Sequence, residues 1–158
     1  MNSEVIDLSS EDTVCEEVGD FPLGIYGSGG TFLGNYPVVC GGSHYGTYEL
    51  SNKCYKLDET KQYTEFATMQ KPRIYAGIIP HENKMWITGG ADETQISKTT
   101  EFILASGIST PGPDLPISLE GHAMSKLNLS TSMIIGGFND DSNSAFVYDK
   151  TWYFDHHT

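Results

Sequence analysis

Two cysteines are the residues whose spacing points most directly to a covalent reaction. Cys40 and Cys54 lie symmetrically about Thr47, so a hairpin centred on that residue sets them opposite each other. Opposed residues of an antiparallel ladder have Cα atoms ~4.5–5.5 Å apart, which overlaps the geometry of a disulfide. The alternative is a pair of small buried apolar residues, because a long loop leaves the strand register unfixed. Cys15 is left over if the other two pair.

The other chemically versatile side chains do not assemble into a reactive group. The histidines show no metal-ligand spacing, and the oxygen-rich segment 139–143 lacks the glycine and the distant glutamate of a calcium loop. The glycine-rich segment 24–30 is followed by no helical pattern and no Lys-Ser/Thr pair, which argues against a phosphate-binding loop. No Ser-His-Asp or Cys-His grouping can be assembled from local signals. We therefore predict no catalytic residue, no metal site and no cofactor.

Asn128 begins the triplet Asn128-Leu129-Ser130, which is an acceptor sequence for N-glycosylation. We expect it in the turn between two strands, where a modifying enzyme has access. The triplet carries meaning only in a secreted chain, and a chance occurrence is the alternative.

Acidic residues outnumber basic ones in this chain of 158 residues, 21 Asp and Glu against 9 Lys and Arg, for a net charge of −12. The balance argues against nucleic acid and anionic membranes as partners, since both attract basic surfaces. Solubility is the simplest role of the charge, and a basic protein partner is the alternative. No apolar run approaches the ~18 residues of a membrane span.

Double glycines punctuate the chain at intervals of 48 and 47 residues and define its elements. They are Gly41-Gly42, Gly89-Gly90 and Gly136-Gly137, and each pair ends a short apolar run typical of a strand. A polar loop follows each pair, and then an aromatic or aliphatic strand. The 17 glycines and 9 tyrosines fit an all-β chain with many turns, and no window shows a sustained helical period.

We expect three units of four strands, 22–69, 70–115 and 116–158, after an N-terminal strand and acidic linker at 1–21. In the first unit the expected strands are 25–33, 36–42, 53–57 and 63–67. In the second they are 75–80, 85–90, 99–104 and a weak one at 107–110, and in the third 121–126, 132–137, 145–148 and 152–155. A further strand is expected at 5–8, followed by a polar turn at 9–12 and an irregular acidic segment at 13–22.

A strand that ends in Gly-Gly at this period resembles the kelch repeat, in which each copy builds one four-stranded propeller blade. The resemblance covers residues 22–155 and includes the link Met69–Arg73 before Ala76-Gly77. It implies an all-β fold of about three antiparallel kelch-type β-propeller blades. Tyr63 and Trp152 fill the aromatic position that is usual in the fourth strand of that repeat, whereas the second unit offers none. A non-repetitive β-sandwich is the alternative.

Three blades are fewer than the 4–8 that typically close a propeller. We therefore expect an incomplete propeller: a fragment, a truncated gene product, or a chain that self-associates with a second copy through exposed blade faces. The expected strand at 5–8 resembles the closing strand with which many propellers complete a blade begun at the other end of the chain.

The resemblance implies a non-catalytic protein–protein interaction module, whose partner is set by loops at the propeller faces. The candidate binding loops are Ser43–Ser51, Ala91–Lys98 and Phe138–Ser144. Their aromatic and acidic side chains are candidate contacts with a protein partner, whose identity the sequence does not give. They are His44, Tyr45, Tyr48, Asp92, Glu93, Phe138, Asp140 and Asp141.

Two other functions fit the same resemblance. One is the substrate-binding arm of a ubiquitin-ligase adaptor, although such proteins carry a helical dimerisation region before the propeller and this chain shows none. The other is a galactose-oxidase-like secreted enzyme with Tyr and His copper ligands, a ligand set that this sequence does not display.

The candidate disulfide, the glycosylation triplet and the acidic composition are similar to those of secreted invertebrate kelch-like proteins. They favour an extracellular protein. Residues 1–8 lack a basic segment and a long apolar run, so the signal peptide would be missing from this chain. A cytoplasmic protein is the close alternative.

Overall fold

The computed structural model describes residues 3–6, 15–141 and 144–155, and every regular element in this part of the chain is a β-strand. The expected all-β fold is confirmed. The strands are β1 (Ser3–Ile6), β2 (Cys15–Val18), β3 (Ile25–Tyr26), β4 (Gly29–Leu33), β5 (Tyr36–Cys40), β6 (Ser43–His44), β7 (Lys53–Leu57), β8 (Tyr63–Thr68), β9 (Gly77–His81), β10 (Lys84–Thr88), β11 (Thr100–Leu104), β12 (Ser109–Pro111), β13 (Ala123–Lys126), β14 (Thr131–Ile135), β15 (Phe138–Asp141), β16 (Ser144–Val147) and β17 (Thr151–Asp155).

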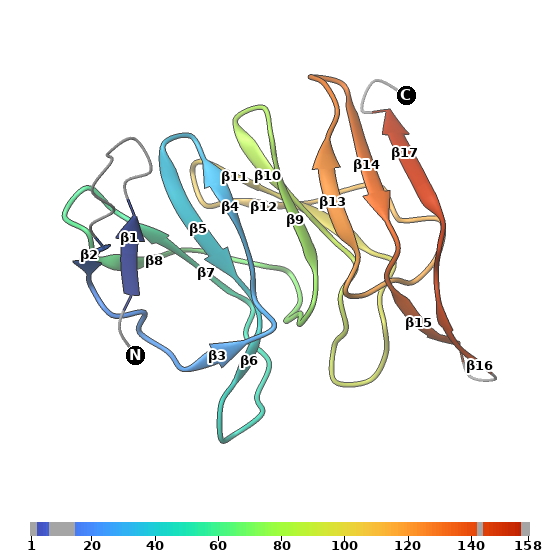
Figure 1. The fold of residues 1–158 in the computed structure, drawn as a ribbon, viewed down its shortest axis with the longest axis horizontal. Helices are drawn as coiled ribbons and strands as arrows, with labels where there is room; N and C mark the ends of the chain where they lie inside the picture. Colours follow the sequence, from blue (N-terminus) through green and yellow to red (C-terminus); the bar gives the residue numbers. More distant parts are fainter. Residues whose placement is uncertain (1–2, 7–14, 142–143, 156–158) are drawn as a thin grey trace.

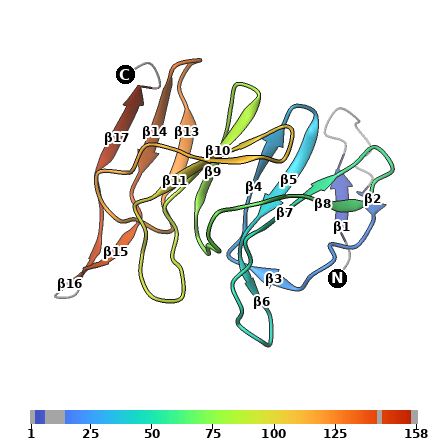
Figure 2. The same cartoon turned by 180° about the vertical axis from the view of Figure 1, so that it is seen from behind.

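Three antiparallel sheets stand side by side and form the body of the molecule (Figure 1). The first sheet has the order β4-β5-β7-β8, the second β9-β10-β11-β12 and the third β13-β14-β17. Figure 2 shows the same succession from behind. Strand pairs β1-β2, β3-β6 and β15-β16 complete the fold.

The second sheet is buried on both faces, which explains the continuous apolar run of β10. Met85 and Ile87 pack toward the first sheet, against a cluster that includes Val38 and Cys54. Trp86 points the other way and packs with Ile134 of the third sheet. Successive side chains of a strand point to opposite faces, so a strand packed on both faces buries consecutive apolar residues, here 85–87.

The double glycines form the same turn three times. All six residues have φ between +57° and +102°, a region that favours glycine because a Cβ is crowded there. The first glycine of each pair donates its N–H to a carbonyl at the start of the third strand of its sheet or just before it. The bonds are 3.0 Å from Gly41 to Lys53 O, 3.1 Å from Gly89 to Thr99 O and 3.0 Å from Gly136 to Lys150 O. A Cβ on Gly41 would lie 2.5 Å from the carbonyl oxygen of Arg73, so the close approach also requires glycine.

The strand expected at 145–148 is present, but it does not belong to the sheet of the third unit. The segment expected at 145–148 as its third strand lies in β16, which pairs with β15 in a separate hairpin. The segment expected as the fourth strand is β17, and it pairs with β14 in the third position. Aromatic residues occur in both β16 and β17, which follow Gly137. The sequence pattern does not show that β16 pairs with β15 and that β17 takes its place beside β14.

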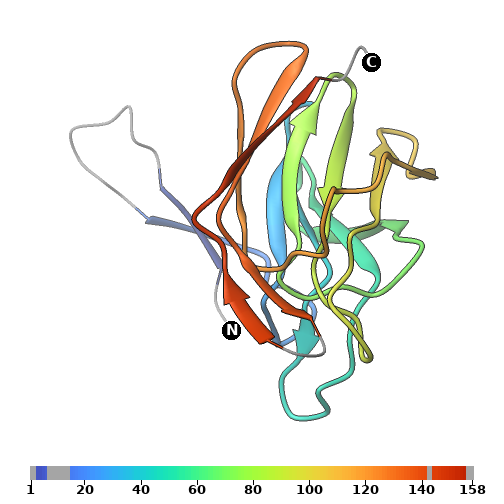
Figure 3. The same cartoon turned by 90° about the vertical axis from the view of Figure 1, so that its right-hand side faces the viewer.

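Smaller corrections concern the N-terminal part. The expected strand 25–33 is split into β3 and β4 because Gly27 takes φ +65° between them. Segment 13–22, expected to be irregular, contains β2, and β1 pairs with β2 rather than with a sheet of the body. The resulting hairpin projects from the body (Figure 3). Residues 7–8 of the expected first strand and its turn at 9–12 lie outside the described residues.

Candidate interaction surface

The segments that follow the three double glycines lie on one side of the molecule. In Figure 1 the 43–51 loop, the 91–98 loop and the β15-β16 hairpin all extend below the sheets. We call this the loop side, and we call the opposite end, where the β4-β5, β9-β10 and β13-β14 turns lie, the turn side. These are the three loops that the sequence predicts as binding loops, and in the structure they lie on the same side of the molecule.

The first loop presents two exposed tyrosines. Tyr45 and Tyr48 are 84% and 71% exposed, and His44 is half-buried within β6. The loop is closed by hydrogen bonds from His44 N to Glu49 O and from Tyr48 N to His44 O, both 2.9 Å long. Tyr48 has φ 61°, so the backbone is held in the left-handed region to close this turn. The two rings stand in solvent on an ordered loop and are available to a partner.

The second loop is organised by Asp92. Its carboxylate accepts hydrogen bonds from the backbone and the hydroxyl of Thr94 and from the backbone of Gln95. The bond from the Thr94 hydroxyl is the main cause that lowers the pKa of Asp92. Asp92 therefore shapes the turn, whereas its neighbour Glu93 is exposed and can contact a partner.

The third loop is the β15-β16 hairpin. Phe138 begins β15 and exchanges backbone hydrogen bonds of 2.8 and 2.9 Å with Glu120. Its side chain is half-buried, whereas Asp140 is exposed. Asp141 pairs with Ser144 at the end of the hairpin, and residues 142–143 lie outside the described part of the chain.

A shallow depression of about 330 Å³ lies on the loop side where the second and third sheets meet. Tyr75, Glu120, Phe138 and Val147 contribute side chains to its wall. Burial raises the pKa of the Glu120 carboxyl, which means that its charge is partly withdrawn from water. A partly desolvated carboxylate between aromatic rings suits a Lys or Arg side chain, because the rings attract a cation as well.

Tyr75 is structurally equivalent to Gly27 in the first unit and Gly121 in the third. Its N–H donates to Gly27 O at 2.8 Å, and its C=O accepts from Gly121 N at 2.9 Å. All three residues are left-handed, with φ of +65°, +58° and +61° along the chain. A tyrosine in this conformation is uncommon, and its ring is 46% exposed beside Glu120. Sequence reasoning missed both Tyr75 and Glu120, although aligning the first two repeats on their double glycines would have placed Tyr75 against Gly27.

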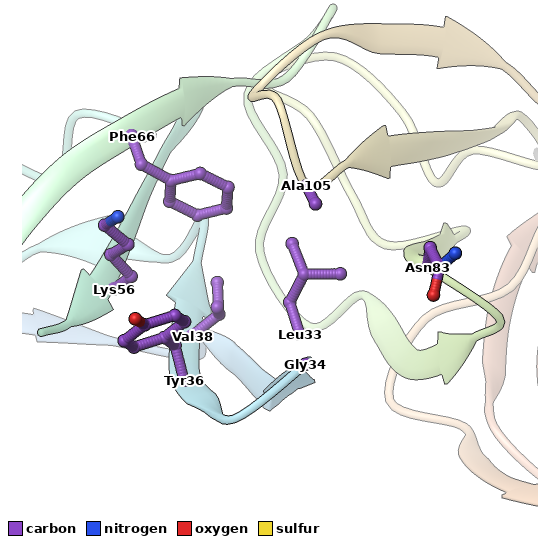
Figure 4. A pocket seen from close by; sticks show the side chains of 8 residues that line it. All are labelled: Leu33, Gly34, Tyr36, Val38, Lys56, Phe66, Asn83 and Ala105. Atoms are coloured by element: carbon purple, nitrogen blue, oxygen red, sulfur yellow. The ribbon is translucent and has the colours of Figure 1, made fainter.

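A second cavity, of about 390 Å³, opens between the first and second sheets on the turn side (Figure 4). Leu33, Val38 and Phe66 give it an apolar floor, and Lys56 lies at its edge with its ammonium 5.2 Å from the centre of the Tyr36 ring. The Tyr36 hydroxyl in turn donates to Glu59 at 2.8 Å. The polar groups of Lys56 and Tyr36 thus already have partners within the chain.

The remaining predicted residues have structural or peripheral positions. Cys40 and Cys54 lie opposite each other in the β5-β7 ladder with Cα atoms 4.1 Å apart, and they form a disulfide, as expected. Asn128 is exposed in the β13-β14 turn, far from the loop side. In the described part of the chain, no three His, Cys, Asp or Glu side chains gather as metal ligands would, and no helix could cross a membrane.

No protein-family model matches this chain, and a search of curated proteins finds no significant relative.

Proposed function

We propose that the three sheets are blades of a kelch-type β-propeller and that the chain is a non-catalytic protein-interaction module that uses its loop side. The observation that carries the proposal is the threefold repetition of one arrangement: a strand, a left-handed double glycine, a loop on the loop side, and a return strand. Repeats of this kind hold a rigid set of sheets and leave their loops free to vary, which suits recognition.

The repetition extends to the links between sheets. Gly42 N donates to Arg73 O at 2.7 Å, and Gly90 N donates to Leu119 O at 2.8 Å, so the first two double glycines each bind the start of the next unit. Sheets joined by equivalent contacts are rotated by similar amounts, as successive propeller blades are. Completion of the ring would require further blades, from a longer chain or from another molecule.

The depression at Glu120 gives the module a defined chemical preference. We infer a basic segment of a protein as the partner, with a Lys or Arg side chain seated against Glu120 and Tyr75. The net charge of −12 acts in the same direction, because it attracts a cationic partner from a distance. Tyr45 and Tyr48, on the 43–51 loop of the same side, then supply further apolar contact area.

A peptide array probed with the labelled full chain tests the proposal. We expect captured peptides to be enriched in Lys or Arg next to an aromatic or aliphatic residue. Glu120→Gln should weaken the affinity for a captured peptide about tenfold, the effect of losing one charged contact worth ~1.4 kcal/mol. Glu59→Gln, an exposed acid on the turn side with the same change in charge, is the matched control and should leave affinity unchanged.

The two variants separate a specific site from general charge attraction. Equal losses for Glu120→Gln and Glu59→Gln would mean that only net charge matters. Capture of acidic or purely apolar peptides would contradict the assigned partner class. Circular dichroism of both variants establishes that they keep the β-sheet fold of the wild type.

A further inference from the structure

Each of the three sheets has an asparagine at the turn between its first two strands. Asn35 lies in the β4-β5 turn, Asn83 in the β9-β10 turn and Asn128 in the β13-β14 turn, all exposed on the turn side. Two positions later stand Pro37, Met85 and Ser130 respectively. Asn128 alone therefore begins an Asn-X-Ser/Thr triplet, and the other two are natural internal controls.

The β13-β14 turn presents the Asn128 amide to solvent. Its Oδ1 accepts hydrogen bonds from the backbone N–H groups of Ser130 and Thr131, each 2.9 Å long, and from the Ser130 hydroxyl at 3.0 Å. These bonds fix the oxygen toward the turn, so the nitrogen Nδ2 faces outward. Asn128 itself is exposed, and nothing in the described structure encloses the turn.

Two leucines flank the asparagine and are unusually exposed for their type. Leu127 is 48% exposed and Leu129 is 81% exposed, at a tip that packs against no neighbouring sheet. Leucine is mostly buried in folded proteins, so these two side chains leave apolar surface in contact with water. A bulky, solubilising carbohydrate on the residue between them would shield both.

A separate observation concerns the compartment in which the chain folds. The Cys40–Cys54 disulfide lies in the core between the first and second sheets, where Cys40 is 3% exposed and Cys54 fully buried. Structural disulfides of this kind form in oxidising compartments such as the lumen of the endoplasmic reticulum. That lumen is also where oligosaccharides are attached to Asn-X-Ser/Thr triplets.

We propose that Asn128 is an N-linked glycosylation site and that the glycan and the Cys40–Cys54 bridge are acquired in the same compartment. The donor is an oligosaccharide linked to a lipid pyrophosphate. The Nδ2–C1 bond to the sugar forms as the bond from C1 to the pyrophosphate oxygen breaks. The lipid pyrophosphate leaves, and the amide gives up one proton to a base of the transferase, so there is no net oxidation or reduction.

The position of the glycan is compatible with the proposed interaction surface. Asn128 lies in the β13-β14 turn on the turn side, whereas the depression at Glu120 is lined by Phe138 and Val147 of the β15-β16 hairpin, which extends on the loop side (Figure 1). A glycan at Asn128 thus points away from the loops and leaves them open. The inference does not depend on the proposed function, and either can fail without the other.

The test begins with the protein isolated from its own cells. Enzymatic removal of N-glycans in heavy-oxygen water converts a glycosylated asparagine to a mass-labelled aspartate, and peptide mass spectrometry then locates the label. We expect the label at position 128 and none at 35 or 83, with Cys40 and Cys54 joined in the same non-reduced digest. An unlabelled, unmodified Asn128 in that protein would overturn the proposal.

Variants of the full chain, directed to the secretory pathway of cultured animal cells behind a cleavable leader, test the acceptor itself. The wild type and Ser130→Thr should show a gel-mobility shift that glycanase removes, whereas Asn128→Gln and Ser130→Ala should show none. Asn83→Gln should keep the shift. The gel mobility of the protein is measured in the cells as well as in the medium, because the glycan is attached before the protein is secreted. A shift that persists in Asn128→Gln, or is missing from the wild type, would contradict the assignment.

Discussion

The guanidinium of Arg73 and the carboxylate of Glu101 form a buried ion pair between the link after the first sheet and the third strand of the second sheet. Nε and Oε1 lie 3.2 Å apart, with side chains only 4% and 1% exposed. Arg73 also donates to Gly89 O at 2.7 Å and to Thr99 O at 3.0 Å. Glu101 accepts further bonds from Gln70 N and the Ser109 hydroxyl. Both charges are therefore compensated.

Breaking this pair from one side should be costly. Arg73→Leu leaves the Glu101 charge buried without its partner, and we expect a loss of about 3–5 kcal/mol in the free energy of unfolding, measured by urea denaturation. Leucine suits the space, because Leu119 occupies the equivalent position in the next unit and is 1% exposed. The double variant Arg73→Leu/Glu101→Gln should lose less free energy of unfolding than Arg73→Leu alone, because it removes the buried charge as well as its partner. Strict additivity of the two single changes would contradict the pairing.

His122 should make the protein sensitive to mild acid. Its ring is buried, which lowers its pKa from 6.5 to about 4, and its Nε2 lies 2.7 Å from the Thr88 hydroxyl of the neighbouring sheet. The unfolded chain takes up a proton near pH 6.5 and the folded chain only near pH 4. Stability is therefore complete above pH 6.5 and is lost as pH falls toward 4, by up to ~3 kcal/mol.

The measurement is the free energy of unfolding at several pH values, for the wild type and for His122→Gln. Glutamine can keep a hydrogen bond to Thr88 but does not titrate. The difference between the two curves isolates this histidine from the carboxylates that titrate in the same range. Parallel curves between pH 7 and 4 would show that His122 does not titrate as its burial predicts.

The Cys40–Cys54 bridge should stabilise the fold by about 3 kcal/mol, the amount expected for closing a loop of this length in the unfolded chain. We expect Cys40→Ala/Cys54→Ala to lower the free energy of unfolding by that order. Cys15→Ser controls for the removal of a thiol as such. Because Cys54 is fully buried, the wild-type bridge should react with a reductant only after denaturation. Rapid reduction of the folded protein would contradict this burial.

Tyr75 should support peptide binding without stabilising the fold. Replacing it with glycine removes a side chain from a left-handed backbone position, so Tyr75→Gly should leave the free energy of unfolding unchanged or raise it by about 0.5–1 kcal/mol. The same change removes one wall of the depression beside Glu120 and should weaken capture of basic peptides. Tyr45→Gly, at another exposed ring, is the comparison. A large loss of stability would show that the Tyr75 ring supports the fold instead.

The repeat made most of the body of this fold predictable. The double glycines located the second strands and their turns, and the symmetry about Thr47 gave the register that pairs Cys40 with Cys54. The β15-β16 hairpin was not predictable, because the loop that precedes the third strand has a different length and its own aromatic residues. Pattern alone also gave no means of seeing that a tyrosine could replace a left-handed glycine.

The candidate surface was predictable at the level of loops but not of contacts. Placing all three loops on one side needs only the repeat. The depression, however, joins Tyr75 of one unit to Phe138 of another, and its carboxylate is partly desolvated by packing between them. The placement of Tyr75 and Phe138 at one depression depends on how the second and third sheets pack, and the spacing of residues within one sheet does not determine that packing. Asp92, predicted as a candidate contact, also organises its own turn, which the sequence did not indicate.

The hydrogen bonds from Tyr75 to Gly27 and from Gly121 to Tyr75 give the row of sheets a polarity. Along the series Gly27, Tyr75 and Gly121, each N–H donates to the preceding member and each C=O accepts from the following one, so the series has a head, at the N–H of Gly27, and a tail, at the C=O of Gly121. A further sheet of the same kind can extend the row only head to tail. Two copies placed head to head cannot continue it, whereas head-to-tail joining produces either a closed ring or an open helix.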